Sequence, residues 1–475
     1  MTAAASPGGA APVAARAPFL WGFRLIPRIE TYPKVVSFAQ TVIGKITLLG
    51  IFGIGLLFTA EHAPLLIVLL AFATALPQRR RIVLTCGTLL WALGMWWRWT
   101  NHPLLLQAGI VLILASLLFW AATRFPDSWF GRRPVASFLT GFALCVLIAS
   151  YLPRGGYLRT ASWELLTVLG AYVWFIAYSL LDSHSNSRDP FALQVGTYHP
   201  FWGSSNTPFV KGAAYLRRIE AHSPEQLAVS QLKGLKLLAW SVILDLFLRK
   251  AFWPVVYGYL GIPVFSQLFD LNVQRASFPW YIAWASLLAN FLGGLVSLSV
   301  SGHRTVASCR MAGFLALRNT YRPLESRSIA EFWNRYFYYF KELLVDCFFY
   351  PTFMRYFKGH RRLRLFAATF AAACFGNAFY HFFRDMDFIE RYGFWRALEG
   401  FQAYLFYTVV LAAGIGISQL RERRVATTGW MRGRLVPALC VTVFFCMLSV
   451  FDFTEKRYAI EDCFRFLAHL FNLTS

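Results

Sequence analysis

Long apolar segments recur along this chain, and they limit its possible folds more than any other feature of the sequence. Each segment is long enough, or nearly so, to cross the roughly 30 Å hydrocarbon core of a bilayer as a helix. Backbone groups in lipid need partners within their own segment, so helices are the structure we expect there. We predict about eleven transmembrane helices, near residues 38–59, 63–77, 81–97, 104–123, 135–152, 161–181, 236–260, 279–300, 364–383, 401–419 and 434–452.

The composition and the distribution of charge support this interpretation. Of the 475 residues, 57% are hydrophobic and only 15% are charged, which is too little charge to keep a soluble domain in solution. The formal net charge of +23 would suggest a nucleic-acid partner in a soluble protein. Here the arginines lie between apolar segments instead of forming one patch, so we expect no nucleic-acid partner and basic loops on the cytoplasmic side.

The cysteines and the chain ends give further limits. The eight cysteines include no Cys-x-x-Cys pair, so the sequence predicts neither a disulfide framework nor a metal site. The first seventeen residues lack the apolar core of a signal peptide and are typical of a cytoplasmic tail. We divide the chain into an N-terminal tail with an interfacial segment (1–36), a transmembrane domain (37–460) and a C-terminal tail (461–475).

Positively charged residues indicate the orientation of the spans. The segment before the first predicted span carries four cations, namely Arg16, Arg24, Arg28 and Lys34. They predict a cytoplasmic N-terminus. Counting spans from there also places Arg79–Arg81 and Arg421–Arg424 on the cytoplasmic side. The predicted outer loops hold fewer cations, so several loops agree on one orientation.

Two polar stretches interrupt the apolar pattern. The first, residues 182–235, is rich in turn-forming residues, and residues 213–238 at its end have the pattern of one amphipathic interfacial helix. This stretch is either a solvated connector or a loop that folds back to line a funnel.

The second polar stretch, residues 302–350, is crowded with charged residues. Charged or irregular segments persist at membrane depth only where protein or water surrounds them. We therefore expect short helices and re-entrant pieces that line a cavity. Arg310, Arg327 and Arg335 are expected to face the protein interior or this cavity.

The predicted helix near residues 364–383 is apolar except for two polar residues, Asn377 and His381. An ionisable group inside a membrane is costly and commonly marks a site or a pathway. Asn377 lies one turn before His381 on the same face, where its side chain can hold the imidazole in one tautomer. The alternatives are structural: a satisfied core histidine, and an asparagine that hydrogen-bonds a neighbouring helix.

A series of motifs fills residues 310–335, where RMAGF is followed by YRPLESRSIAEFWNRY. These motifs resemble the signature of membrane-bound O-acyltransferases, and most closely that of the bacterial alginate O-acetyltransferase branch. In that branch Arg-x-x-Gly-Phe precedes Asn-x-x-Arg-Pro, Ser-Arg-Ser and Phe-Trp-x-Arg-Trp-His, and a histidine follows on an apolar helix, as His381 does here. The matching residues are Arg310, Gly313, Phe314, Arg322, Pro323, Ser326, Arg327, Ser328, Phe332, Trp333 and Arg335.

The resemblance implies a fold, an activity and a location. The fold is an all-α polytopic membrane domain with short re-entrant helices around a central tunnel. The activity moves an acyl group from a thioester, acyl-CoA or acyl carrier, to a hydroxyl of a cell-envelope polysaccharide, with His381 as general base and no permanently bound cofactor. The location is the bacterial inner membrane. Besides the bilayer, the implied partners are the thioester donor, the hydroxyl acceptor and, as an option, a periplasmic protein.

One position departs from the family pattern. The residue that should end the Phe-Trp-x-Arg-Trp-(His/Asn) element is Phe337, and phenylalanine neither donates nor accepts a strong hydrogen bond. We therefore expect a nearby polar residue to assist His381, with Asn334 as first choice and Asp346 as second, and Trp333 and Asn377 in the cavity wall. The alternatives are a lipid or fatty alcohol as acceptor, or a non-catalytic acyl or lipid transport or scaffold protein.

The positive-inside pattern gives a testable topology. A reporter fused after Arg81 is expected to lie in the cytoplasm, because Arg79–Arg81 form one of the basic loops. Green fluorescent protein at this point should fluoresce and alkaline phosphatase should be inactive, whereas the reverse is expected for fusions at residue 100. Alkaline phosphatase activity after Arg81 would overturn the predicted orientation.

Overall fold

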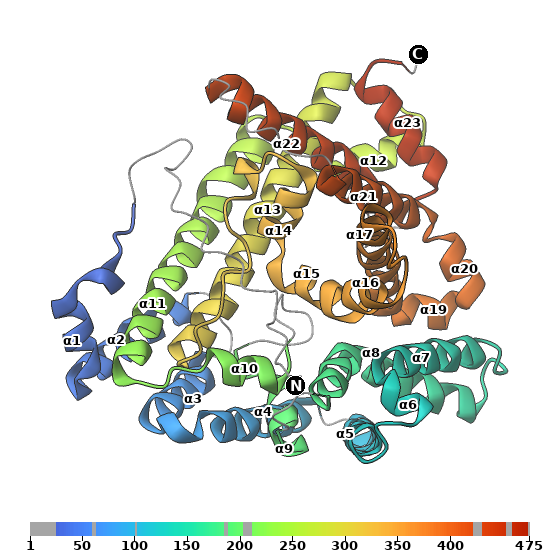
Figure 1. The fold of residues 1–475 in the computed structure, drawn as a ribbon. Helices are drawn as coiled ribbons and strands as arrows, with labels where there is room; N and C mark the ends of the chain where they lie inside the picture. The colour runs from blue at the N-terminus through green and yellow to red at the C-terminus, as the bar shows by residue number, and fades with distance from the viewer. Residues whose placement is uncertain are drawn as a thin grey trace.

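The computed structural model describes residues 25–58, 63–99, 102–184, 189–202, 211–420, 430–452 and 458–473. Within these ranges the regular secondary structure is helical (Figure 1), and the only β-type pairing is an isolated bridge between Glu220 and Phe314. The all-α class predicted from the sequence is thus confirmed. Arg16, Arg24 and the Arg421–Arg424 cluster, which supported the predicted orientation, lie outside the described residues.

The N-terminal part of the chain forms eight α-helices. The first two meet at a sharp bend of 96°, because Thr41 adopts an extended conformation there and its side chain accepts a hydrogen bond from the backbone of Gly44. The helices are α1 (Pro33–Gln40), α2 (Val42–Leu57), α3 (Ala63–Ala75), α4 (Arg80–Trp99), α5 (His102–Arg124), α6 (Trp129–Arg132), α7 (Pro134–Ser150) and α8 (Tyr157–Asp182).

The middle of the chain contains the two longest helices. Ser223 accepts a hydrogen bond from the backbone of Gln226 and Pro224 follows it, so the long helix begins there, twelve residues before the predicted span at 236. The prediction of a single interfacial helix over 213–238 is therefore wrong, since the helical structure is interrupted between Ile219 and Pro224. The helices are α9 (Phe191–Tyr198), α10 (Ala213–Ile219), α11 (Pro224–Phe247) with its π-helical continuation η3 (Leu248–Phe252) and η4 (Pro254–Tyr259), α12 (Phe265–Val273) and α13 (Trp280–Met311).

The C-terminal part combines short helices with three long ones. Its final helix packs Cys463, Phe466 and Leu470 against Phe265 and Phe269 of α12. The elements are α14 (Ile329–Tyr336), α15 (Tyr338–Leu344), η6 (Val345–Phe349), α16 (Tyr350–Arg355), α17 (Arg361–Phe370), η7 (Ala371–Gly376), α18 (Asn377–Arg384), α19 (Met386–Tyr392), α20 (Phe394–Glu399), α21 (Gln402–Leu420), η8 (Met431–Leu435), α22 (Val436–Leu448), η9 (Ser449–Phe451) and α23 (Ile460–Leu470).

Seven helices of the described chain are long and apolar enough to cross a membrane, or eight if the bent pair α1–α2 counts as one span. They coincide with eight of the predicted segments, which supports a polytopic membrane protein. The predicted spans at 63–77 and 135–152 form shorter apolar helices. The seven are Leu106–Arg124, Tyr157–Asp182, Pro224–Tyr259, Trp280–Met311, Arg361–Arg384, Gln402–Leu420 and Met431–Phe451.

The largest hydrophobic core joins helices from distant parts of the chain. It includes Phe142 of α7, Trp163 of α8, Phe332 of α14, Phe382 of α18 and Phe445 of α22. The short helices α14 and α15 therefore lie inside the bundle, between the long helices, as Figure 1 shows. This position agrees with the prediction of short helices within the protein for residues 329–349, whereas residues 302–311 of the same predicted stretch continue the long helix α13.

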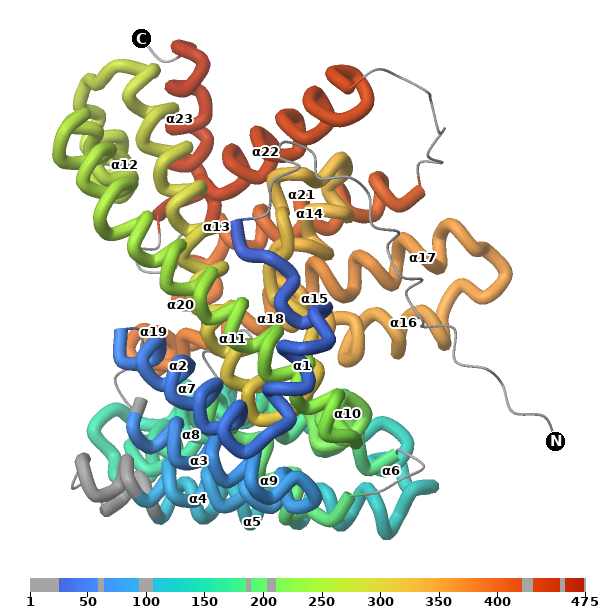
Figure 2. Tube along the Cα trace, turned by 90° about the vertical axis from the view of Figure 1, so that its left-hand side faces the viewer, coloured from blue at the N-terminus to red at the C-terminus, as the bar shows by residue number. Residues whose placement is uncertain are grey.

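Helices α11 and α13 run side by side in both views (Figures 1 and 2). Gly293 of α13 is buried against the indole ring of Trp253, which lies between η3 and η4 in the continuation of α11, so closely that a Cβ atom at residue 293 would overlap the ring. The next residue, Gly294, is exposed and has open space around the position of a Cβ atom. The absence of a side chain at Gly293 therefore allows this helix contact.

This pair of glycines gives a matched test of the packing. Gly293→Ala is expected to destabilise the fold by about 1–3 kcal/mol, because the new methyl group forces the Trp253 ring to move. Gly294→Ala, the control, should be neutral or stabilising by up to about 1 kcal/mol, since alanine favours the helix. Thermal unfolding of both variants in detergent would measure the difference, and equal midpoints would contradict the proposed contact.

Candidate functional site

A cavity of about 600 Å³ lies between α13, α14, α15, α18 and α21. Its volume is in the range of small-molecule binding sites. Aromatic side chains form most of its wall, and a smaller number of polar groups converge on it. The lining residues are Leu298, Ser301, Trp333, Tyr336, Phe337, Phe340, Asn377, Tyr380, His381, Arg384, Tyr404, Tyr407 and Asp452. The structure therefore brings together three residues selected from the sequence: Trp333, Asn377 and His381.

The helix that carries Asn377 and His381 is continuous from Arg361 to Arg384. Its middle part, η7, is π-helical, and Gly376 at the end of this part packs against the ring of Phe348. Such π-helical turns are frequent at functional sites, because they change which side chains share a face. Asn377 and His381 follow in regular α-helix, four residues apart, and both face the cavity.

His381 is half-buried among aromatic rings. The centroid of its ring lies 4.7 Å from that of Tyr404, 5.1 Å from that of Tyr380 and 5.6 Å from that of Phe340. Its Nδ1 atom is buried and has no hydrogen-bond partner among the described residues. The imidazole is thus held by packing while one ring nitrogen keeps its hydrogen-bonding capacity.

Asn377 is 1% exposed, and its two amide atoms differ. The Oδ1 atom accepts a hydrogen bond of 3.2 Å from the hydroxyl of Tyr404, whereas Nδ2 has no partner within the described chain. The expected role of Asn377 in holding the imidazole is not seen, since its oxygen is bonded to Tyr404. A buried amide donor without a partner costs about 1–3 kcal/mol, so its presence in a cavity wall points to a ligand.

The opposite wall comes from α14 and α15. Ser328 begins α14 by accepting a hydrogen bond from the backbone of Glu331, and the helix ends before Phe337, whose non-helical backbone separates α14 from α15. Trp333, Tyr336, Phe337 and Phe340 consequently face the cavity together. Burial raises the pKa of the Tyr336 hydroxyl, which keeps it neutral and available as a hydrogen-bond donor.

The two residues that we expected to assist His381 lie elsewhere. Asn334 is exposed on α14 and is absent from the cavity wall. Asp346 of η6 accepts hydrogen bonds from Lys211, at 2.9 Å, and from the hydroxyl of Tyr178, at 3.0 Å. The structure therefore does not bring Asn334 or Asp346 to His381.

The Asp346 side chain belongs to a cluster of charges around the buried amine of Lys211. The amine, with 5% of its side chain exposed, also lies 3.8 Å from Glu342 and stacks over the rings of Tyr178 and Tyr215. Burial alone would raise the pKa of Glu342, but Lys341 and Lys211 hold that pKa below its ordinary value. This cluster ties the segment before α10 to η6.

The three arginines that we expected to face the interior or the cavity make contacts with the backbone and with nearby residues. Arg310 is buried and its Nε atom donates to the carbonyl of Ala316 at 2.8 Å. Arg335 forms an ion pair of 2.8 Å with Glu331, and Arg327 is half-buried with its backbone N–H donating to Glu331. None of the three lines the cavity, although Arg310 and Arg335 make contacts within the segment that does.

Sequence reasoning missed several polar residues of the cavity, namely Ser301, Tyr336, Arg384, Tyr404, Tyr407 and Asp452. Their helices are separated by many residues in the chain, so no local motif joins them. One signal was present for Asp452. It is a carboxylate directly after an apolar span, and such a charge commonly marks a function.

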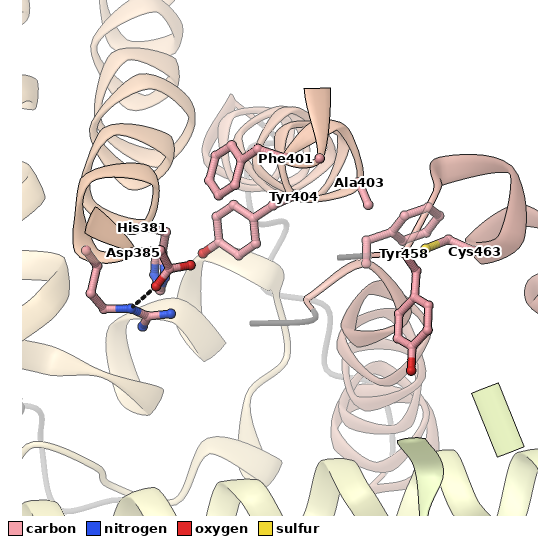
Figure 3. A pocket seen from close by; sticks show the side chains of 10 residues that line it. His381, Asp385, Phe401, Ala403, Tyr404, Tyr458 and Cys463 are labelled. Carbon is pink, nitrogen blue, oxygen red and sulfur yellow. Dashed lines mark hydrogen bonds and ion pairs between the residues drawn. The ribbon is translucent and has the colours of Figure 1, made fainter. Parts of the chain in front are cut away.

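A second, smaller pocket adjoins the cavity. It shares His381, Arg384 and Tyr404 with the cavity, so these residues separate the two spaces. Figure 3 shows Tyr404 pointing from α21 towards His381 and Asp385, with Tyr458 and Cys463 on the far side. Arg384 forms an ion pair of 3.5 Å with Asp385 at this point.

The cavity lies near one end of the helices that form it. His381 is twenty residues from Arg361 at the start of its span, about 30 Å along a helix. Helix α21 runs antiparallel to this span, since Tyr404 contacts Asn377 while Gln419 hydrogen-bonds Thr369. The cavity is consequently far from the cations at the start of α17.

Comparison with known proteins adds no assignment. No protein-family model matches the sequence, and no curated protein matches it. Among the described residues, no group of three histidine, cysteine or carboxylate side chains is placed to hold a metal ion. Function must therefore be inferred from the cavity itself.

The Lys211 cluster predicts a structural effect for Asp346. Asp346→Asn is expected to destabilise the fold by about 1–3 kcal/mol, because it leaves the buried amine without its closest anion. The exposed Asp127 provides the control, and Asp127→Asn should leave the unfolding midpoint unchanged. Thermal unfolding in detergent would compare them. A midpoint unchanged in Asp346→Asn would contradict this role for the cluster.

Proposed function

We propose that this protein is a membrane-embedded O-acyltransferase that transfers an acyl group from a thioester to a hydroxyl of a cell-envelope polysaccharide. The observation that carries the proposal is the pair of unpartnered nitrogen atoms, Nδ1 of His381 and Nδ2 of Asn377, in the wall of one 600 Å³ cavity. The facing wall begins with Trp333, part of the motif that resembles the acyltransferase family. A general base, a hydrogen-bond donor and room for a substrate thus meet at one place.

In the proposed reaction His381 acts as general base. Its imidazole takes the proton of the acceptor hydroxyl as that oxygen attacks the carbonyl carbon of the thioester. The carbonyl oxygen becomes an oxyanion, to which the free N–H of Asn377 can donate; such a donor contributes about 3–4 kcal/mol in a site without water. The C–S bond then breaks, and the imidazolium returns the proton to the leaving thiolate.

The number of spans, their orientation and the membrane in which they lie are part of the same proposal. Eleven spans around a tunnel, a cytoplasmic N-terminus and a place in the bacterial inner membrane follow from the basic loops and the resemblance. Arg361 and Arg362 are exposed at the start of the span that carries His381, and they support a cytoplasmic location for that end. The thioester donor, acyl-CoA or acyl carrier, is cytoplasmic, and the acceptor or a periplasmic partner reaches His381 from the opposite end.

A second candidate function is transport of acyl groups or lipids without catalysis. Phe337 lines the cavity at the position where the resemblance calls for a histidine or asparagine, so α14 supplies no polar group at this point. The aromatic wall also suits an apolar acceptor such as a fatty alcohol or a membrane lipid. These alternatives share the cavity with the first proposal and differ from it in the outcome of one experiment.

That experiment replaces His381. His381→Ala is expected to lower acyl transfer by about 10²–10⁴-fold, the usual contribution of a general base. Membranes from an expressing strain would be incubated with radiolabelled acetyl-CoA, and label would be counted in the polysaccharide and lipid fractions. The distribution between these fractions identifies the acceptor class.

His360→Ala serves as the control, because His360 is exposed and lies directly before Arg361, at the other end of the span that carries His381. It should keep wild-type activity. Equal transfer by wild type and His381→Ala would reject the general base, and label in neither fraction from the wild type would favour transport.

A further inference from the structure

Asp452 is a carboxylate in the cavity that the proposed reaction does not yet use. It follows η9 directly, one residue beyond the span Met431–Phe451, and its side chain is exposed to the cavity that His381 lines. Within the described residues, it supplies the only carboxylate of the cavity wall. An anion in a mainly aromatic wall is costly unless it binds something.

The groups that face Asp452 come from three helices. Arg384 and His381 approach from α18, Tyr404 and Tyr407 from α21, and Tyr336 from α14. Arg384 brings a compensating positive charge, although its ion pair is formed with Asp385. The tyrosine hydroxyls are neutral donors, so the Asp452 carboxylate is the strongest hydrogen-bond acceptor facing the cavity.

Strong hydrogen-bond acceptors are otherwise scarce in this wall. The Oδ1 atom of Asn377 already accepts a hydrogen bond from Tyr404, and the hydroxyl oxygens of Ser301 and the tyrosines are uncharged and weaker acceptors than a carboxylate. A ligand rich in hydroxyl groups needs acceptors for its O–H donors, and it needs flat apolar surfaces for its carbon faces. The aromatic rings supply the surfaces, and Asp452 supplies the acceptor.

We propose that Asp452 binds and orients a polyhydroxylated acceptor, so that one hydroxyl faces His381 while a neighbouring hydroxyl donates to the carboxylate. This inference rests on the proposed acyltransferase function and specifies how the acceptor is held. Asp452 takes no part in the proton transfer. The reacting proton passes to His381, the oxygen–carbon bond forms and the carbon–sulfur bond breaks.

The test compares two acceptors of the same acyl group. With acetyl-CoA as donor, purified protein in nanodiscs gives thiol release when water is the acceptor, and membranes give label in envelope polysaccharide. Asp452→Asn is expected to lower polysaccharide labelling by about 10–100-fold, because it removes a charged hydrogen-bond acceptor. His381-dependent thiol release with water should change by less than about threefold, since water does not need orientation by Asp452.

Two further variants separate this role from folding. Asp452→Glu should restore part of the polysaccharide labelling, because it keeps the carboxylate. Asp462→Asn on α23, whose carboxylate pairs with Arg465 outside the cavity, is the matched control and should behave as wild type. The unfolding midpoint of each variant would be measured alongside.

The outcomes are distinct. Loss of labelling with preserved thiol release and rescue by glutamate supports the proposal. Wild-type labelling by Asp452→Asn, or equal loss of labelling and thiol release, overturns it while leaving the acyltransferase function intact. If the wild type itself gives neither polysaccharide labelling nor thiol release, the proposed function fails and this inference fails with it.

Discussion

The cost of burying charge and polar groups determines how this chain is built. Arg80 is fully buried, and its guanidinium donates to the carbonyls of Ala73 and Ala221. Lys236 in the long helix α11 pairs with Glu30 at 2.6 Å, and this contact holds the start of the described chain against the bundle. Each of these cations has partners within the protein, because a buried charge without them would cost several kcal/mol.

The cavity wall departs from this pattern, because it contains polar atoms without hydrogen-bond partners. The same bundle that satisfies Arg80 and Lys236 leaves Nδ2 of Asn377 and Nδ1 of His381 without hydrogen bonds among the described residues. Both atoms belong to one helix face, and both residues line one cavity. A histidine with a purely structural role, or an asparagine that only joins two helices, would normally form these hydrogen bonds within the fold. Other buried atoms, such as Nδ1 of His303 and Nδ2 of Asn319, also lack partners among the described residues. It is therefore the convergence of Asn377 and His381 on one cavity that supports a binding site over a packing role.

Local patterns predicted much of this arrangement, and tertiary contacts set the rest. Hydrophobic runs located the long helices, and four-residue spacing placed Asn377 and His381 on one face. The sequence could not show that Asn334 lies on the exposed face of α14, because the helix is too short for its apolar pattern to fix the rotation. Nor could it pair Asp346 with Lys211, since 135 residues separate the two partners. Asp452 joins the cavity only through the packing of the last long helix.

The position of the cavity offers a physical explanation for the presence of phenylalanine at residue 337. His381 lies about 30 Å along its helix from the exposed arginines at the start of α17, so a donor from that side must pass most of the bilayer thickness. Desolvating the charged phosphates of the donor along such a path would be costly, whereas moving the acyl group and the uncharged arm that carries it would cost less. Trp333, Phe337 and Phe340 form an aromatic wall suited to that part of the donor. In the proposed acyl transfer, phenylalanine at 337 would help to bring the acyl group to His381, while polar recognition of the acceptor would fall to Asp452.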